Sequence, residues 1–167
     1  MEKEERKETM SVEGTWDIGA TTWKGNRILE EYVRGLKQKK IIGSLCPSCG
    51  KVIVPPRAIC GRCHTRMDER VTVSNRGTVN CFVVSPPVKK GEYNVLGMDP
   101  VEMGMAEEGE VLIPVYVQFD GSYSNVATTL ENVDPKDVYI GMRVQAVWKE
   151  ETEGALSDLE AVEPIKD

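Results

Sequence analysis

The chain has 167 residues, of which 29% are charged and 40% hydrophobic, and its formal net charge at pH 7 is −6. This fits one ordinary domain plus a small appendage. It argues against a membrane-spanning protein, because no apolar run approaches the length that crosses a bilayer. The first residues, Met1-Glu-Lys-Glu-Glu-Arg-Lys, contain no apolar stretch of a signal peptide, so we expect a cytoplasmic protein with no membrane partner.

The charges are unevenly divided along the chain. Residues 24–91 contain fourteen Lys or Arg and four Asp or Glu, whereas residues 92–167 contain four and seventeen. The first half is therefore basic and the second acidic. This asymmetry predicts an anionic partner near the first half and argues against nucleic acid wrapping the second.

The N-terminal region predicts a tail followed by one helix. Residues 1–25 are expected to be a flexible extension, whose Trp16 and Trp23 could anchor a partner or cap a core. Residues 26–39 predict an amphipathic helix, because apolar residues recur there at spacings of three and four: Ile28, Leu29, Tyr32, Val33 and Leu36. That face either packs on the core of the protein or binds a partner.

Residues 40–70 contain two Cys-x-x-Cys pairs, Cys46 with Cys49 and Cys60 with Cys63, separated by ten residues. Two such knuckles bring four thiolates to the corners of a tetrahedron, as a closed structural zinc site requires. We therefore predict a rubredoxin-like zinc ribbon, with a short strand before Cys46, a second at 51–54 and a turn at 55–57. Because few residues there are apolar, the metal must hold the ribbon together.

Other readings of the cysteines are weaker. Two disulfides need an oxidising compartment, and a redox Cys-x-x-Cys usually occurs once. Iron in a rubredoxin-like site stays open, since four thiolates bind either metal. The only histidine, His64, directly follows Cys63 and could replace a cysteine as ligand, although a surface position is the simpler reading.

Residues 71–167 predict a five-stranded OB-fold barrel. Alternating apolar residues mark strands at about 71–84, 111–119, 122–130, 141–149 and 155–162. Asp134 and Pro135 begin a short helical turn between the third and fourth strands, which is the OB order. Gly77 is the expected bend of the first strand. The fold class is thus mainly β, with an N-terminal helix, a zinc ribbon and a barrel.

Residues 85–110 interrupt the barrel pattern with a long loop. It contains Pro86-Pro87 and three methionines, Met98, Met103 and Met105. Loops of this length are functional or disordered. The methionines could form an adaptable apolar surface, or the loop could be a flexible excursion.

The string from Cys46 to Cys63, Cys-Pro-Ser-Cys-Gly-Lys-Val-Ile-Val-Pro-Pro-Arg-Ala-Ile-Cys-Gly-Arg-Cys, resembles the acyl-CoA-associated zinc-ribbon/OB-fold family. Residues 76–79 (Arg-Gly-Thr-Val) and 140–144 (Ile-Gly-Met-Arg-Val) extend the resemblance over about 26–150. It implies an accessory subunit that sits beside a thiolase-type catalytic subunit in a hetero-oligomer and shares its CoA thioester. Some longer family members serve thiolases of aromatic acylsuccinyl-CoA thioesters. The loop 85–110 and the N-terminal extension depart from the short members.

The chain lacks the groups for thiolysis on its own. A thiolase needs an activated cysteine, a base and donors for the enolate oxygen. With four cysteines on metal, only Cys81 is free, and its place in a barrel strand is not that of a nucleophile. We therefore predict no independent enzyme.

For the CoA phosphates, the first candidate is Arg57 on the stiff Pro55-Pro56 turn. Weaker candidates lie on and after the helix: Arg34, Lys37, Lys39 and Lys40. These cations could instead pair with acidic residues of the partner.

Two other functions remain open. Zinc ribbons and OB barrels also bind nucleic acid, but the presence of only two phenylalanines in the chain and the acidic barrel half argue against this role. A free-standing acyl-CoA-binding protein is the third hypothesis. Binding of acyl-CoA by the isolated chain would favour it.

Overall fold

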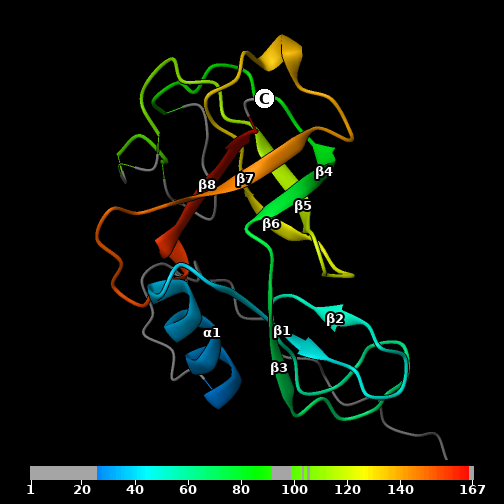
Figure 1. Cartoon of the computed structure of the whole chain (residues 1–167). Coiled ribbons are helices and arrows are strands. Elements are labelled where there is room, and N and C mark those ends of the chain that lie inside the picture. The colour runs from blue at the N-terminus through cyan, green and yellow to red at the C-terminus, as the bar shows by residue number, and fades with distance from the viewer. Residues whose placement is uncertain (1–25, 92–98, 103, 105, 166–167) are drawn as a thin grey trace, which may run out of the picture.

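The structure is a computed structural model, and it describes residues 26–91, 99–102, 104 and 106–165. The predicted extension 1–25, with both tryptophans, lies outside these residues, as do Met98, Met103 and Met105. Within them the chain forms one α-helix, a three-stranded ribbon sheet and a curled five-stranded sheet (Figure 1). The predicted fold class is confirmed.

Helix α1 (Arg27–Lys37) begins at Asn26, whose side-chain oxygen accepts a hydrogen bond from the backbone N–H of Leu29. This is a standard N-cap, and it satisfies one of the free amides of the first turn. The helix buries Tyr32 and Leu36 against the rest of the protein, while Leu29 stays 40% exposed. The apolar face of α1 therefore packs mainly on the core of the protein, which is one of the two alternatives predicted from the sequence.

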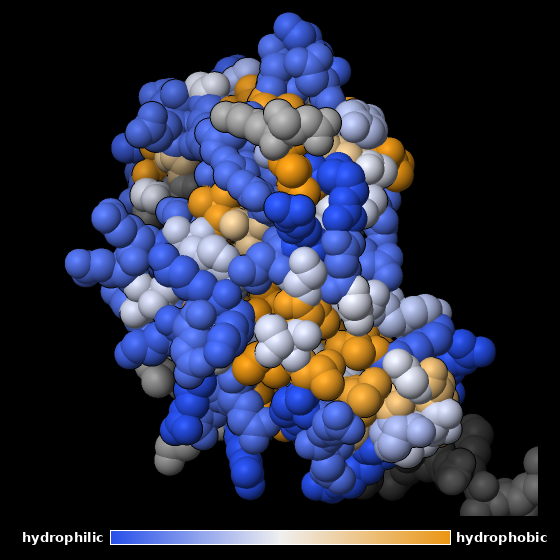
Figure 2. All heavy atoms as spheres, viewed as in Figure 1, coloured by the Kyte–Doolittle hydropathy of each residue, from blue (hydrophilic) through white to orange (hydrophobic). Residues whose placement is uncertain are grey.

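The ribbon sheet consists of β1 (Ile41–Leu45), β2 (Val52–Ile53) and β3 (Glu69–Val73) in the order β2-β1-β3, all antiparallel. Figure 2 shows hydrophobic residues gathered over the ribbon near β1 and β2. Leu45, Val52 and Ile53 of these two strands are half-buried. The sheet extends past the predicted end of the ribbon at residue 70, because β3 pairs along the whole of β1.

The five-stranded sheet has the order β6-β5-β4-β7-β8. Its strands are β4 (Arg76–Phe82), β5 (Pro114–Phe119), β6 (Val126–Thr129), β7 (Arg143–Trp148) and β8 (Leu159–Pro164). A parallel bridge from Leu130 to Val162 brings the two edge strands together. This closure, with the 3₁₀ turn η1 (Pro135–Asp137) between β6 and β7, is the OB arrangement. As predicted, Asp134 caps η1 by accepting from the N–H of Lys136.

The prediction of a single strand over residues 71–84 is wrong, because this segment forms two strands, β3 and β4, which belong to two different sheets. The chain turns at Ser74, whose hydroxyl accepts from the N–H of Arg76, so residues up to Val73 pair with the ribbon and those from Arg76 pair with the barrel. Gly77 itself pairs regularly with Phe119 and Val144. The register shift lies between Val79 and Cys81, where Asn80 forms a β-bulge.

Two further strand boundaries differ from the prediction. Strand β6 begins only at Val126, since residues 122–125 form a loop that contacts the ribbon. Strand β8 begins at Leu159, because the 3₁₀ turn η2 (Leu156–Asp158) precedes it. The buried Asp158 carboxylate there accepts hydrogen bonds from the backbone N–H groups of Glu153, Gly154 and Ala155, which holds the loop in a tight turn.

The ends of the loop 85–110 are tied together. Ser85 and Leu112 exchange two hydrogen bonds, and Val88 bonds to Glu110 and Gly109. These bonds extend the β4–β5 hairpin beyond its regular ladder. The base of the predicted flexible excursion is therefore ordered.

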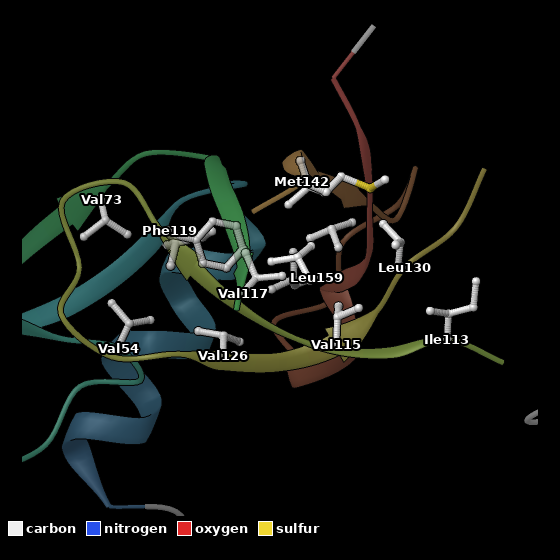
Figure 3. Packing of buried hydrophobic residues seen from close by; sticks show 14 of the residues in the cluster. Val54, Val73, Ile113, Val115, Val117, Phe119, Val126, Leu130, Met142 and Leu159 are labelled. Atoms are coloured by element: carbon white, nitrogen blue, oxygen red, sulfur yellow. The ribbon is translucent and has the colours of Figure 1, made fainter. Parts of the chain in front are cut away.

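One hydrophobic core joins the helix, the ribbon and the barrel. Val54 and Val73 of the ribbon region pack with barrel residues such as Val117, Phe119 and Val126 (Figure 3). Polar bonds add to this junction: the Ser124 hydroxyl both accepts from the N–H of Val54 and donates to its C=O, each at 2.7 Å. The metal knuckles are thereby attached to a rigid support.

Candidate metal centre and the adjoining groove

The two knuckles have matching backbone hydrogen bonds. The N–H of Gly50 donates to the C=O of Cys46, and the N–H of His64 donates to the C=O of Cys60, both at 2.9 Å. Gly50 and His64 have φ of 67° and 54°, the left-handed region in which a side chain is strained. His64 thus occupies the place that a glycine takes in the first knuckle. Its side chain is exposed, and it is not part of the cysteine cluster.

The four sulfur atoms are close enough for one metal ion. Those of Cys46, Cys49, Cys60 and Cys63 all lie within 4.8 Å of one another, and the sulfurs of Cys49 and Cys60 are 4.0 Å apart. Four zinc–sulfur bonds of about 2.3 Å in a tetrahedron place sulfurs about 3.8 Å apart. The cluster therefore fits zinc, and four thiolates leave no open coordination position. Such a site supplies structure rather than catalysis.

Local backbone amides favour the thiolate form. The backbone N–H groups of Cys63 and Arg62 lower the pKa of the Cys60 thiol to about 7, although burial acts in the opposite direction. Metal binding requires deprotonated thiols, so amides directed at the sulfur help to prepare the site.

Sequence reasoning missed two residues that support the metal centre. Met67, only 1% exposed, packs against Cys46 and Cys60 as part of the ribbon's small core. Ser44, fully buried, accepts a hydrogen bond from the N–H of Arg57 at 3.0 Å and so fixes the Pro-Pro-Arg turn to β1. Neither residue belongs to a motif: Ser44 lies in β1 and Met67 precedes β3, and only the folding of the ribbon brings them to these places.

A groove lies between α1 and the Pro-Pro-Arg turn. It has a volume of about 290 Å³, and its lining includes Ile28, Leu29 and Tyr32 from the first half of the helix, together with Pro55 and Arg57. Burial raises the pKa of Tyr32 to about 12, so its phenol is neutral. The groove combines an apolar wall with one guanidinium.

The structure does not bring the other predicted CoA residues to this groove. Arg34 is exposed and paired with Glu30. Lys37 is the last residue of α1, Lys39 and Lys40 follow it, and none of the three lines the groove; along the helix axis Lys37 is about 14 Å from Ile28 at 1.5 Å per residue. There the C=O of Lys37 accepts from the Thr152 hydroxyl, which ties this end of the helix to the loop before η2. Only Arg57 therefore adjoins the groove.

The described residues do not assemble a catalytic set around Cys81. Its thiol is exposed on the outside of the barrel, where its cross-strand neighbour is Tyr116 and the next is Ala127. Neither neighbour carries an imidazole, carboxylate or amine. Among the same residues, no helix has the length and apolar composition that a membrane crossing requires.

The geometry defines a class: a structural zinc ribbon joined through one core to an OB-like half-barrel. Comparison with known proteins agrees. Residues 34–68 match the ChsH2 rubredoxin-like zinc ribbon domain. A DUF35 domain-containing scaffold protein of Methanocaldococcus jannaschii is 27% identical over 110 residues, covering 65% of this chain and 67% of that protein.

Two solved structures share the fold. A DUF35-family protein of unknown function from Sulfolobus solfataricus matches with a TM-score of 0.59 and 19% identity, covering 83% of this chain and 86% of that chain. The Ltp2-ChsH2(DUF35) aldolase matches with a TM-score of 0.57 and 18% identity, covering 86% and 98%. The ribbon match and the scaffold protein support the DUF35/ChsH2 family, in line with the sequence resemblance, and the two solved structures support the fold. They do not extend to a particular thiolase subunit.

Proposed function

We propose that this protein is a non-catalytic, zinc-containing accessory subunit of a thiolase-type acyl-CoA complex. The observation that carries the proposal is the closed cluster of four cysteines, which can hold a metal but leaves it no position for a substrate. The similarity to a scaffold protein and to a chain of an aldolase complex supports the same role. The chemistry then belongs to the partner, and this chain supports its folding and its thioester site.

The groove beside Arg57 is the proposed contact with the CoA thioester. Its apolar lining suits the pantetheine arm, and the cationic side chain of Arg57, one of its lining residues, suits a CoA phosphate. The hydrogen bond from the Arg57 N–H to buried Ser44 holds the backbone of that residue in place. Preorganisation of this kind lowers the entropy cost of binding.

For the acyl group, the resemblance favours an aromatic acylsuccinyl-CoA, as in benzoylsuccinyl-CoA thiolysis. The groove itself has no side chain that reads an acyl group, so this part of the proposal depends on the resemblance. Activity of the assembled complex on benzoylsuccinyl-CoA, compared with acetoacetyl-CoA, is the direct measurement.

Co-purification tests the accessory role. The tagged full-length chain is recovered from extract of its own cells, its partner is identified by mass spectrometry, and the pair is co-expressed. We expect a stable complex with one zinc per copy of this chain, and a partner that loses activity when expressed alone. A thiolase that is fully active without this chain and elutes apart from it would refute the role.

A charge-matched pair of variants tests the CoA contact. Arg57→Ala removes the guanidinium at the groove, whereas Arg62→Ala removes an exposed arginine of the second knuckle that does not line it. We expect Arg57→Ala alone to raise the KM of the complex for its CoA thioester by about tenfold, as for loss of one charged hydrogen bond. Equal KM values for the two variants would show that Arg57 does not contact the CoA thioester.

A further inference from the structure

The outer surface of β4, β5 and β6 carries a regular array of uncharged side chains. In its central row Cys81 lies opposite Tyr116, and Tyr116 lies opposite Ala127. In the row toward the loop 85–110, Val83 bonds to Pro114 through the backbone and Pro114 pairs with Thr129. Val83 is 62% exposed and Tyr116 is 53% exposed, so this surface is open in the isolated chain.

The third row consists of amides. The Asn80 side chain, placed outward by the β-bulge, donates to the side-chain oxygens of Gln118 and Asn125. These bonds satisfy part of the hydrogen-bonding capacity of the three amide groups and tie them to one another. The three rows together, from Asn80, Gln118 and Asn125 to Val83, Pro114 and Thr129, are called the uncharged face.

The absence of charge distinguishes this face from the rest of the barrel. Charged residues are 29% of the chain, and the neighbouring strands β7 and β8 present Arg143, Glu160 and Glu163. Depletion of charge around an exposed aromatic residue is the composition of an interface core. A membrane surface or a nucleic acid would require cations, which this face does not offer.

Shape and size indicate the kind of occupant. A depression of about 160 Å³ opens between Cys81, Val83, Tyr116 and Ala127, large enough for one apolar side chain. Strand spacing and residue rise give the face an area of about 300 Å². A stable interface buries about 800 Å² per partner, so this face alone would hold neither a second copy nor any other partner lastingly. The occupant must also contact surface beyond the face, such as Tyr123, which is two residues before Asn125, is 56% exposed and has the Lys51 ammonium over its ring.

We propose that the uncharged face is the surface on which the catalytic subunit docks, with an apolar side chain of that subunit in the depression beside Tyr116. This inference rests on the proposed function and adds to it the site of assembly. The face contains no residue of the Arg57 groove, so docking and contact with CoA use separate parts of the chain.

The test uses the complex of the full-length chain with its co-expressed catalytic subunit. Tyr116→Lys and Val83→Lys place a charge in the face, and Leu156→Lys, at an apolar residue of η2 that is 59% exposed, is the matched control. Since all three side chains are exposed, each isolated variant should keep the thermal midpoint of the wild type. We expect both face variants to raise the Kd of the complex at least about tenfold and the control to leave it unchanged.

The outcomes separate the two proposals. A wild-type complex that Tyr116→Lys and Val83→Lys leave intact would overturn the docking face and leave the accessory role standing. If the wild-type chain forms no complex with an acyl-CoA enzyme, the proposed function fails and the docking face with it. If the wild-type chain self-associates, as measured by analytical ultracentrifugation, and Tyr116→Lys abolishes this, the face binds a second copy and not the catalytic subunit.

Discussion

Replacement of Ser124 by alanine tests how firmly the ribbon is joined to the barrel. The hydroxyl makes two hydrogen bonds of 2.7 Å to the N–H and C=O of Val54, a residue only 1% exposed. Alanine leaves both backbone groups without a side-chain partner in a place that water reaches poorly. An unsatisfied buried group costs about 1–3 kcal/mol, so we expect the free energy of unfolding to fall by about 2–4 kcal/mol.

Urea denaturation of the zinc-loaded protein, followed by circular dichroism, measures this loss. With an m-value of about 2 kcal/mol/M, the midpoint should fall by about 1–2 M. Ser157→Ala is the control, because Ser157 is exposed and its hydroxyl accepts a hydrogen bond from the Lys149 ammonium rather than from a buried backbone group. Zinc content is measured for both variants, so that metal loss is not mistaken for loss of the junction. A Ser124→Ala midpoint equal to that of Ser157→Ala would refute the reasoning.

Three further predictions follow from single features. Cys46→Ser should release the zinc, measured by elemental analysis, and lower the thermal midpoint of the whole chain; an unchanged midpoint in a metal-free protein would contradict the structural role. Gly77→Ala should destabilise by about 1–3 kcal/mol in urea, because its Cβ would lie 2.7 Å from the C=O oxygen of Gln118; retention of the wild-type midpoint would show that β5 can move. Burial acts to raise the pKa of Asp158, but the N–H groups of residues 153–155 together hold this pKa below its ordinary value. The ionised carboxylate therefore stabilises the fold at a pH above the ordinary pKa of aspartate, and this stabilisation is lost as the pH falls toward the pKa of Asp158 in the folded protein. Stability of Asp158→Asn, measured between pH 3 and pH 7, should accordingly depend less on pH than that of the wild type, and parallel curves would disprove it.

The sequence was most informative about structural features that depend only on residues close together in the chain. Cysteine spacing predicted the sulfur cluster because each knuckle is a local turn, and the 3.6-residue period predicted α1 because its face depends only on adjacent turns. Asp134 likewise caps the turn in which it stands. The succession of barrel strands along the chain could be predicted because the alternation of apolar and polar residues marks each strand by itself.

Contacts between residues far apart in the chain could not be predicted from the sequence in the same way. Nothing near Ser74 in the sequence says that the chain changes sheets there, since both neighbouring segments alternate alike. The Ser124–Val54 bonds join residues 70 positions apart, and Ser44 contacts Arg57 only because β1 turns back at the first knuckle. The groove and the uncharged face have the same origin: each consists of residues that are ordinary one by one and distinctive only when assembled.

The hydrogen bonds that join the two ends of the loop 85–110 affect how the length of this loop can vary among related proteins. Because Val88 bonds to both Gly109 and Glu110, the barrel ends at that point whatever the segment beyond it does. Residues can therefore be gained or lost between these anchors without disturbing the strand register, since lengthening a loop whose ends are already fixed costs little free energy. Relatives of this chain should differ most in length here, and a reporter peptide inserted after Lys90 should leave the rest of the molecule folded.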